Sequence, residues 1–236
     1  SPDQSGCREQ VVYFDGLGRP SQTVDCGITP DGKDLVSLQE YDDQGRKLRT
    51  WLPAKSAGNG NYMTLSSLQS GASSLAGGDA RPYLQTTYEA SPLNRPVAQH
   101  GAGETWAEHP VSYQYITRNP RSFPSSYYMT PSGNFLGVCT TDEDGNQAYE
   151  FKDGFGRTIL AGRMDGSDPC FAYYEYDNHD DLVNVYPPFV TYYQMNEPEG
   201  PYATQSSYSY HYDFLHRCVY KKLPERDAIY YIYDHG

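Results

Sequence analysis

The chain has 236 residues, of which 24 are tyrosine, 22 are glycine and 17 are proline. Glycine and proline at this frequency disfavour long helices, and no apolar run is long enough to cross a bilayer as a helix. Acidic residues outnumber basic ones by 30 to 18, which gives a net charge of −12. This balance excludes the basic surface of a nucleic-acid-binding protein and any electrostatic attraction to an anionic membrane.

A five-residue turn, Asp-x-x-Gly-Arg, recurs along the chain. Three copies are complete, and the others keep the spacing but replace the leading aspartate, the glycine or the arginine. A last copy begins at Asp234. The residues that we assign to this repeated turn are Asp15, Gly18, Arg19, Asp42, Gly45, Arg46, Ser91, Asn94, Arg95, Asp153, Gly156, Arg157, Asp177, Asp213, Arg217 and Asp234.

The residue types fit a β-hairpin turn. Aspartate at the first position of a type I turn accepts hydrogen bonds from backbone amides two residues further on. The fourth position needs a positive φ angle, which glycine adopts freely and asparagine tolerates, so Asn94 is an easy substitute. Asp180 and His216 are less easy at this position, although both residue types are enriched there. Each copy therefore predicts a tight turn between two antiparallel strands.

The residues on either side of the turns read as strands. Tyrosines alternate before the turns, a period of two that places them on one face of a strand. The pairs are Tyr113 and Tyr115, Tyr174 and Tyr176, Tyr210 and Tyr212, and Tyr231 and Tyr233. Prolines follow several turns at a similar distance and predict the end of the returning strand at Pro53, Pro187 and Pro224, because proline donates no ladder hydrogen bond.

Two long insertions interrupt this pattern, at about residues 54–82 and 99–140. The first is rich in glycine, serine and alanine. It contains either one short helix, formed by Met63, Leu65 and Leu68, or a mobile loop. The second contains Trp106 and the Tyr113/Tyr115 strand. We expect both to be part of a single β region over residues 1–236, with loop insertions.

Motifs for catalysis, metal binding or cofactor binding are weak. Asp142, Asp144 and Asn146 alternate like ligands of a calcium loop, but Gly145 is misplaced for one, so a turn is the favoured interpretation. The acidic group at residues 177–181 also coincides with a repeat turn. Nucleophile-elbow, zinc-protease and phosphate-binding signatures do not occur in the sequence. We therefore expect no enzyme activity, no metal and no cofactor, and we expect the repeated arginines to pair with turn carboxylates or carbonyls.

The repeated segment Tyr-x-Tyr-Asp-x-x-Gly-Arg resembles the YD repeat of bacterial Rhs proteins. Residues 11–20 are similar to the start of the repeat-bearing front region of Rhs-repeat-associated core proteins, and residues 88–95 to its middle signature. The resemblance covers the chain from about residue 8 to its end. The copies here are unevenly spaced, and the self-cleaving aspartate motif of the family and any effector are missing.

The resemblance implies a fold in which stacked antiparallel β-hairpins form one continuous, curved or spiralling sheet. In related toxins that sheet becomes a hollow shell around a C-terminal effector, and the proteins lie at the bacterial cell surface or are secreted. The partner it implies is the remainder of the same polypeptide, with further repeats and an enclosed effector. Because the sequence stops inside a turn, we expect this chain to be a piece of a longer protein.

Two functions from different classes fit these observations. The first is a non-catalytic structural segment of such a shell. The alternative is a carbohydrate-binding module, since tyrosine and tryptophan faces stack on sugar rings and the partner would then be a glycan. The favoured interpretation of the tyrosine stripes is a packing surface between hairpins, because a stacked sheet needs an apolar face to cohere. Candidate residues for a ligand surface are Trp106, Tyr174, Tyr176, Tyr210 and Tyr212.

Overall fold

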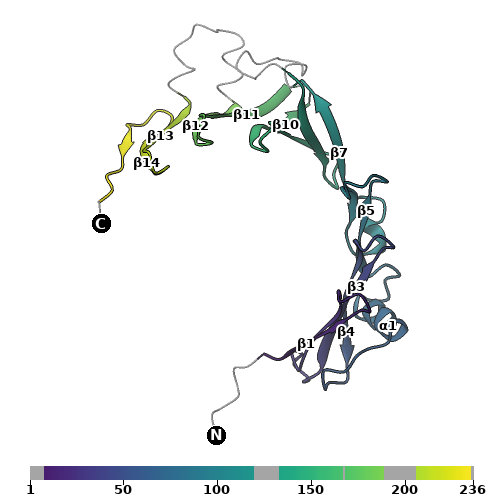
Figure 1. The fold of residues 1–236 in the computed structure, drawn as a ribbon. Coiled ribbons are helices and arrows are strands. Elements are labelled where there is room, and N and C mark those ends of the chain that lie inside the picture. Colours follow the sequence, from purple (N-terminus) through teal and green to yellow (C-terminus); the bar gives the residue numbers. More distant parts are fainter. Residues whose placement is uncertain (1–7, 120–132, 167, 189–205, 235–236) are drawn as a thin grey trace. The chain divides into compact units, whose positions relative to one another are not determined.

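The computed structural model describes residues 8–119, 133–166, 168–188 and 206–234. In these residues the predicted all-β class of stacked antiparallel hairpins is confirmed: 15 antiparallel strands are hydrogen-bonded in chain order within one open sheet (Figure 1). The first seven strands along the chain are β1 (Gln10–Phe14), β2 (Pro20–Asp25), β3 (Asp34–Tyr41), β4 (Lys47–Ser56), β5 (Tyr83–Tyr88), β6 (Pro96–His100) and β7 (Val111–Arg118). The other eight are β8 (Phe135–Thr141), β9 (Gln147–Lys152), β10 (Thr158–Asp165), β11 (Asp168–Tyr176), β12 (Leu182–Tyr186), β13 (Tyr208–Tyr212), β14 (Cys218–Lys222) and β15 (Ile229–Tyr230).

The chain divides into two compact units, Ser1–Ser112 and Tyr113–Gly236. That the whole of residues 1–236 acts as one domain stays a prediction. Of the 99–140 insertion, residues 120–132 lie outside the described residues, and the remainder supplies a 3-10 turn, η1 (Glu104–Trp106), and strand β7.

The repeated turns all join an odd-numbered strand to the even-numbered strand that follows it. Since neighbouring strands are antiparallel, such turns lie on the same edge of the sheet within each unit. We call them the turn row: residues 15–19, 42–46 and 89–95 in the first unit, and 153–157, 177–181 and 213–217 in the second. The turn at residues 142–146 joins β8 to β9 and therefore lies on the opposite edge.

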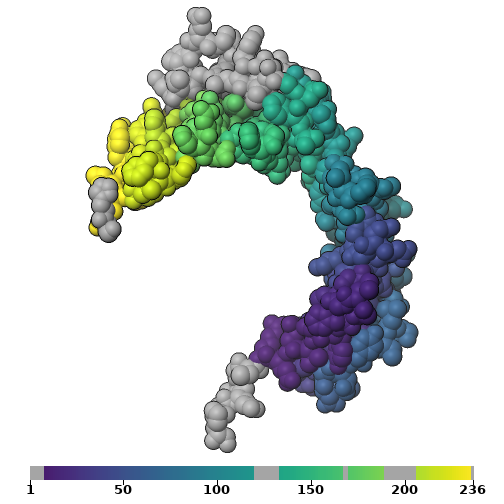
Figure 2. Space-filling model, viewed as in Figure 1, coloured from purple at the N-terminus to yellow at the C-terminus, as the bar shows by residue number. Residues whose placement is uncertain are grey.

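The core of the first unit lies between the sheet and a helix, α1 (Leu65–Leu75), which Figure 2 shows in blue against the purple strands. Val24, Val36 and Ala54 are fully buried on the sheet side, and Leu68 and Ala72 on the helix side. Leu68 and Ala72 are four residues apart and so share one helix face. The helix approaches closely because Gly71 has no side chain: a Cβ there would lie 2.9 Å from the Cβ of Ala54.

Two buried polar side chains fix the segment that leads into α1. The Gln22 amide donates to the Met63 carbonyl (2.6 Å) and accepts from the Met63 amide (3.1 Å). The Asp34 carboxylate accepts from the backbone amides of Gly27 and Gly60, both at 2.8 Å. Gln22 and Asp34 therefore both have partners, which removes the cost of burying these two polar groups alone. The helix expected near Met63, Leu65 and Leu68 thus forms on the surface of the sheet.

Strand β4 continues through Pro53 to Ser56, so the predicted end at that proline is wrong. The register explains the difference: Trp51 pairs with Leu38 and Ala54 pairs with Val36, which leaves Leu52 and Pro53 in a bulge. A bulge tolerates proline because its residues need not donate to the ladder. The predicted ends at the other two prolines agree with the strand bounds, since β12 ends at Tyr186 and β14 at Lys222.

The core of the second unit is formed by β9, β10 and β11. Phe151, Leu160 and Phe171 are almost completely buried there. Two glycines on the paired strands make room for them. A Cβ at Gly137 would lie 2.5 Å from the Phe151 ring, and one at Gly162 would lie 2.7 Å from the Cα of Phe171.

Candidate functional site

In each complete turn of the turn row, the leading aspartate accepts hydrogen bonds from the backbone and from the arginine of the same turn. In the first copy, one carboxylate oxygen of Asp15 accepts from the backbone amides of Leu17 and Arg19, both at 2.9 Å. The other oxygen accepts from the Arg19 Nε at 2.7 Å. Gly18 occupies the fourth position with a φ of +75°. Hydrogen bonds from the backbone and side chain of Arg19 lower the pKa of the Asp15 carboxyl below its ordinary value.

The same contacts recur in the three other turns that keep both the aspartate and the arginine. The aspartate to Nε distances are 2.7 Å for Asp42–Arg46, 2.7 Å for Asp153–Arg157 and 2.8 Å for Asp213–Arg217. His216 fills the fourth position of the last turn with a φ of +60°. The repeated arginine is therefore part of its own turn and does not form a free basic row.

The turn at residues 89–95 obtains the same contacts by a different route. Ser91 accepts from the Leu93 amide at 3.2 Å, but its hydroxyl carries no charge to pair with Arg95. Glu89, two residues earlier, takes this role and binds the Arg95 guanidinium with both oxygens, at 2.8 and 2.7 Å. Hydrogen bonds from Arg95 and Ser91 lower the pKa of Glu89 to about 2. Asn94 adopts the positive φ of the fourth position, +55°.

The turns without arginine keep the aspartate contacts to the backbone. Asp177 accepts from the amides of His179 (2.8 Å) and Asp181 (3.0 Å). On the opposite edge, Asp142 accepts from the Asn146 amide and side chain, at 2.8 and 2.9 Å. Both carboxylates are thus engaged by their own turns. Among the described residues no three His, Cys, Asp or Glu side chains form a group that could hold a metal ion.

A tyrosine just before five of the turn copies links its hairpin to the previous one. The hydroxyl donates to the backbone carbonyl of the residue that follows the fifth position of the preceding turn. The five contacts are Tyr41 to Pro20 (2.9 Å), Tyr88 to Lys47 (3.0 Å), Tyr176 to Thr158 (3.0 Å), Tyr212 to Leu182 (3.0 Å) and Tyr233 to Cys218 (2.8 Å). This tyrosine contact joins neighbouring hairpins at the turn row in both units.

The arginine of the preceding turn lies over the same tyrosine ring. The guanidinium carbon is 4.3 Å from the ring centre for Arg19 over Tyr41, 4.5 Å for Arg46 over Tyr88, 4.9 Å for Arg157 over Tyr176 and 4.5 Å for Arg217 over Tyr233. Stacking of this kind adds a cation–π attraction to the hydrogen bond. One arginine thereby closes its own turn and contacts the next hairpin.

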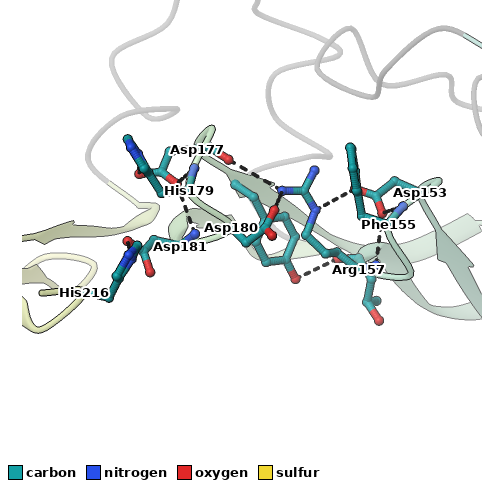
Figure 3. Close-up of polar contacts among 10 residues, drawn as sticks. Asp153, Phe155, Arg157, Asp177, His179, Asp180, Asp181 and His216 are labelled. Atoms are coloured by element: carbon teal, nitrogen blue, oxygen red, sulfur yellow. Dashed lines mark hydrogen bonds and ion pairs between the residues drawn. The ribbon is translucent and has the colours of Figure 1, made fainter. Parts of the chain in front are cut away.

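The arginine also reaches the fourth position of the next turn. Arg157 Nη1 lies 2.6 Å from an Asp180 carboxylate oxygen and 3.5 Å from the Asp177 carbonyl (Figure 3). Arg46 Nη1 lies 3.2 Å from the Asn94 side-chain oxygen in the same way. The fifth position of one turn thus contacts the fourth position of the next.

Removing one tyrosine hydroxyl tests this linkage. We expect Tyr176→Phe to lower the free energy of unfolding by about 0.5–1.5 kcal/mol, because the hydrogen bond to Thr158 is lost while the ring stays under Arg157. Tyr230→Phe is the control, since Tyr230 is 72% exposed and its hydroxyl has no hydrogen-bond partner among the described residues. Denaturant titration of both purified variants measures the difference, and equal stabilities would contradict a structural role for the hydroxyl.

The five candidate residues for a ligand surface differ in their burial and in their contacts. Tyr176 and Tyr212 are engaged in the tyrosine contact between hairpins. Tyr174 and Tyr210 are partly buried on β11 and β13, and Lys221 lies 5.9 Å from the Tyr210 ring centre. Trp106, in the first unit, is 47% exposed and packs against Gly101 and Gly103.

Sequence reasoning missed the carboxylate of Glu89 and the hydroxyl contacts of the tyrosines. Glu89 stands outside the five-residue pattern, and the signal that could have found it is Ser91, which replaces the acid at the first position and so points to another carboxylate for Arg95. The alternation of the tyrosines predicts one face of a strand and no hydroxyl contact. The tyrosines that stand directly before the leading acid of a turn, as Tyr41 does before Asp42, are the available signal for a second, polar role.

Cysteines and helices point to no further site. Cys26, Cys139, Cys170 and Cys218 are free thiols, and Cys7 lies outside the described residues. The α-helix in the described part of the chain has 11 residues, and no helix there is long and apolar enough to cross a membrane.

Comparison with solved structures gives the same fold at low sequence identity. A chain of the Photorhabdus luminescens Tc holotoxin pore, in a form with a substitution in TccC3, matches with a TM-score of 0.61 and 16% identity over 94% of this chain. A chain of the TcdB2–TccC3–Cdc42 complex matches with a TM-score of 0.60, 16% identity and the same coverage. This chain spans about a tenth of each of those chains, 10% and 11%.

Comparison by sequence gives the family. No curated protein sequence matches the chain significantly. A family model described as "domain of unknown function (DUF6443)" matches residues 1–118, half of the chain, and this match includes α1 and the first three turns of the turn row. The chain therefore belongs to the DUF6443 family.

Proposed function

We propose that this chain is a non-catalytic, structural segment of the shell wall of a larger, toxin-type protein of the Rhs/YD-repeat kind. In this role the segment encloses other parts of the same polypeptide, including a C-terminal effector, and the whole protein is secreted or lies at the bacterial surface. Its contribution is mechanical: the hairpins hold one another in register.

The observation that carries this proposal is the repeated linkage at the turn row. In this linkage a carboxylate closes the turn, an arginine stacks on the next tyrosine, and the tyrosine hydroxyl binds the preceding hairpin. These are the functional groups that a catalytic or binding site would need. In the complete turns, Asp15, Asp42 and Asp153 each bind their own arginine. Because these side chains already bind other residues of the turn row, we favour a structural role over catalysis at this edge of the sheet.

The two similar solved structures support the toxin-type context. Their names describe a Tc holotoxin pore and a complex of TcdB2 with TccC3 and Cdc42, and this chain spans about a tenth of each matched chain. At 16% identity they support the fold and not a shared activity.

The full-length protein that contains this segment provides the test. We expect its structure, determined by cryo-electron microscopy, to place residues 8–234 in the wall of a hollow body. Limited proteolysis gives a second measurement: Arg157→Ala loosens the turn row and exposes enclosed segments to protease. Arg163→Ala is the matched control, because Arg163 is an exposed arginine of β10 outside the turn row. A segment that lies outside the wall, or equal cleavage of both variants, would argue against a shell function.

A glycan array distinguishes the carbohydrate-binding alternative. Trp106 is 47% exposed, whereas the four candidate tyrosines are partly buried. Saturable binding of a neutral glycan that is lost in Trp106→Ala would replace the structural proposal by a binding function. Absence of binding by the wild-type chain would leave the structural proposal in place.

A further inference from the structure

The fifth position of each turn faces the fourth position of the next turn, and the residue types at these two positions are matched. A Cβ at Gly45 would lie 3.0 Å from the Arg19 Nη1, so an arginine passes over a glycine at the first joint. Arg46 faces an amide at the second. In the second unit Arg157 faces a carboxylate, that of Asp180.

The joint between the hairpins β11–β12 and β13–β14 reverses this arrangement. Its fifth position is an acid, Asp181, and its fourth position is His216, whose Nδ1 lies 2.8 Å from an Asp181 carboxylate oxygen (Figure 3). Arginine is charged at every physiological pH, whereas histidine changes charge near neutrality. The positive charge of His216 at this joint is therefore lost when the pH rises and the ring is deprotonated.

We propose that uptake of a proton by His216 tightens the joint between the hairpins β11–β12 and β13–β14, and that this joint loosens as the pH rises above neutrality. The proposal concerns a regulatory property of the fold and holds whether or not the chain belongs to a shell.

The charged groups that face His216 favour its protonated form. Asp181 is its direct partner, and the carboxylates of Asp177 and Asp213 also lie close by. Asp213 is paired with Arg217 of the same turn, so it contributes less than an unpaired carboxylate. His179, at the tip of the neighbouring turn, is the second titratable ring, 6.0 Å from that of His216 between centres. The hydrogen bond and charge of Asp181 raise the pKa of His216 above its ordinary value.

The ladder between these hairpins is short, which makes a single side-chain contact important. β12 and β13 pair over two residue pairs, Asn184–Ser209 and Val185–Tyr208. Two further side-chain bonds cross the joint, from Ser209 to Asn184 at 2.8 Å and from Tyr212 to the Leu182 carbonyl at 3.0 Å. The contact between Asp181 and His216 thus adds a third side-chain bond between the described residues of the two hairpins.

The direction of the pH dependence follows from the raised pKa. A group whose pKa is higher in the folded state binds its proton more tightly when folded, so it stabilises the fold under acidic conditions. This stabilisation is complete below about pH 6.5, the ordinary value for histidine, and is lost as the pH rises through the raised pKa. The joint is therefore tighter below neutral pH and looser above it.

Nuclear magnetic resonance of the histidine ring protons gives the first test. We expect His216 to titrate with a midpoint above about 6.5, and the midpoint to fall in Asp181→Asn. His216→Asn assigns the signal and keeps a residue that tolerates the left-handed backbone, as Asn94 does with its φ of +55°. A wild-type midpoint at or below 6.5 would overturn the proposal without any variant having to fold.

Hydrogen exchange gives the second test, after correction for the intrinsic pH dependence of exchange. We expect protection of the β12 and β13 amides to fall about twofold to fivefold between pH 6 and pH 8, the range for an exposed ion pair. The β4–β5 amides, beside the joint of Arg46 with Asn94, are the internal control and should not change. The double variant Asp181→Arg/His216→Asp rebuilds the pairing of Arg157 with Asp180 and should remove the pH dependence. An unchanged dependence in that variant or in His216→Asn would refute the role of His216.

Discussion

Replacing Phe151 by alanine should lower the free energy of unfolding by about 3–5 kcal/mol, the range for deleting a fully buried phenylalanine. The Phe151 ring is completely buried at the centre of the second core, beside Leu160 and Phe171. Gly137 on the paired strand leaves it room, so a cavity forms when the ring is removed and little of the surroundings can close it. Denaturant unfolding followed by circular dichroism measures the loss.

Phe155→Ala is the matched control for this change. Phe155 belongs to the same β9–β10 hairpin but is 82% exposed at the tip of its turn. Its removal should change the free energy of unfolding by no more than about 0.5 kcal/mol, as expected for a surface substitution. Similar losses in the two variants would mean that β9 does not form the centre of this core.

Gly162→Ala should lower the free energy of unfolding by about 3 kcal/mol, the upper end of the usual range for overpacking, although it adds a single methyl group. The new Cβ would meet the carbonyl oxygen of Cys170 and lie 2.7 Å from the Cα of Phe171. These are backbone atoms of the paired strand β11, so no side-chain rotation relieves the overlap and the two strands must separate locally.

Gly154→Ala separates this steric effect from the general effect of losing a glycine. Gly154 is in the 153–157 turn, and a Cβ there would meet nothing within 4 Å. Its φ is not in the left-handed region, so alanine should be neutral or slightly stabilising by reducing the entropy of the unfolded chain. Thermal unfolding of the two variants should therefore shift in clearly different amounts, and a stable Gly162→Ala protein would disprove the close approach of β10 and β11.

The repeated turn made the all-β class predictable from the sequence. Aspartate, glycine and arginine at fixed spacing determine the local hydrogen bonds of Asp15, Gly18 and Arg19, so local residue types were sufficient. The tyrosine alternation likewise indicated the strands that precede the turns. Both signals are local in the sequence, where pattern reasoning is strongest.

The contacts that depend on pairing between distant segments were not predictable. The strand through Pro53 depends on the register between β3 and β4, which no local pattern encodes. The same holds for Asp34, whose carboxylate joins two loops far apart in the sequence. The use of Glu89 in place of Ser91 required knowing that Arg95 needs a carboxylate within reach.

The linkage at the turn row has a consequence for how this chain can change in evolution. Within each unit, every tyrosine hydroxyl, stacked arginine and fifth-to-fourth contact of the row connects a hairpin to its immediate neighbour. Proteins built from such nearest-neighbour interfaces tolerate duplication or loss of whole repeats, provided that the new neighbours match. The matched residues are few, such as Arg157 with Asp180 or Asp181 with His216. Each matched pair is divided between two hairpins, so an exchanged hairpin fits only where its fourth position matches the turn before it and its fifth position matches the turn after it. These two positions therefore determine which hairpins can be neighbours in the sheet.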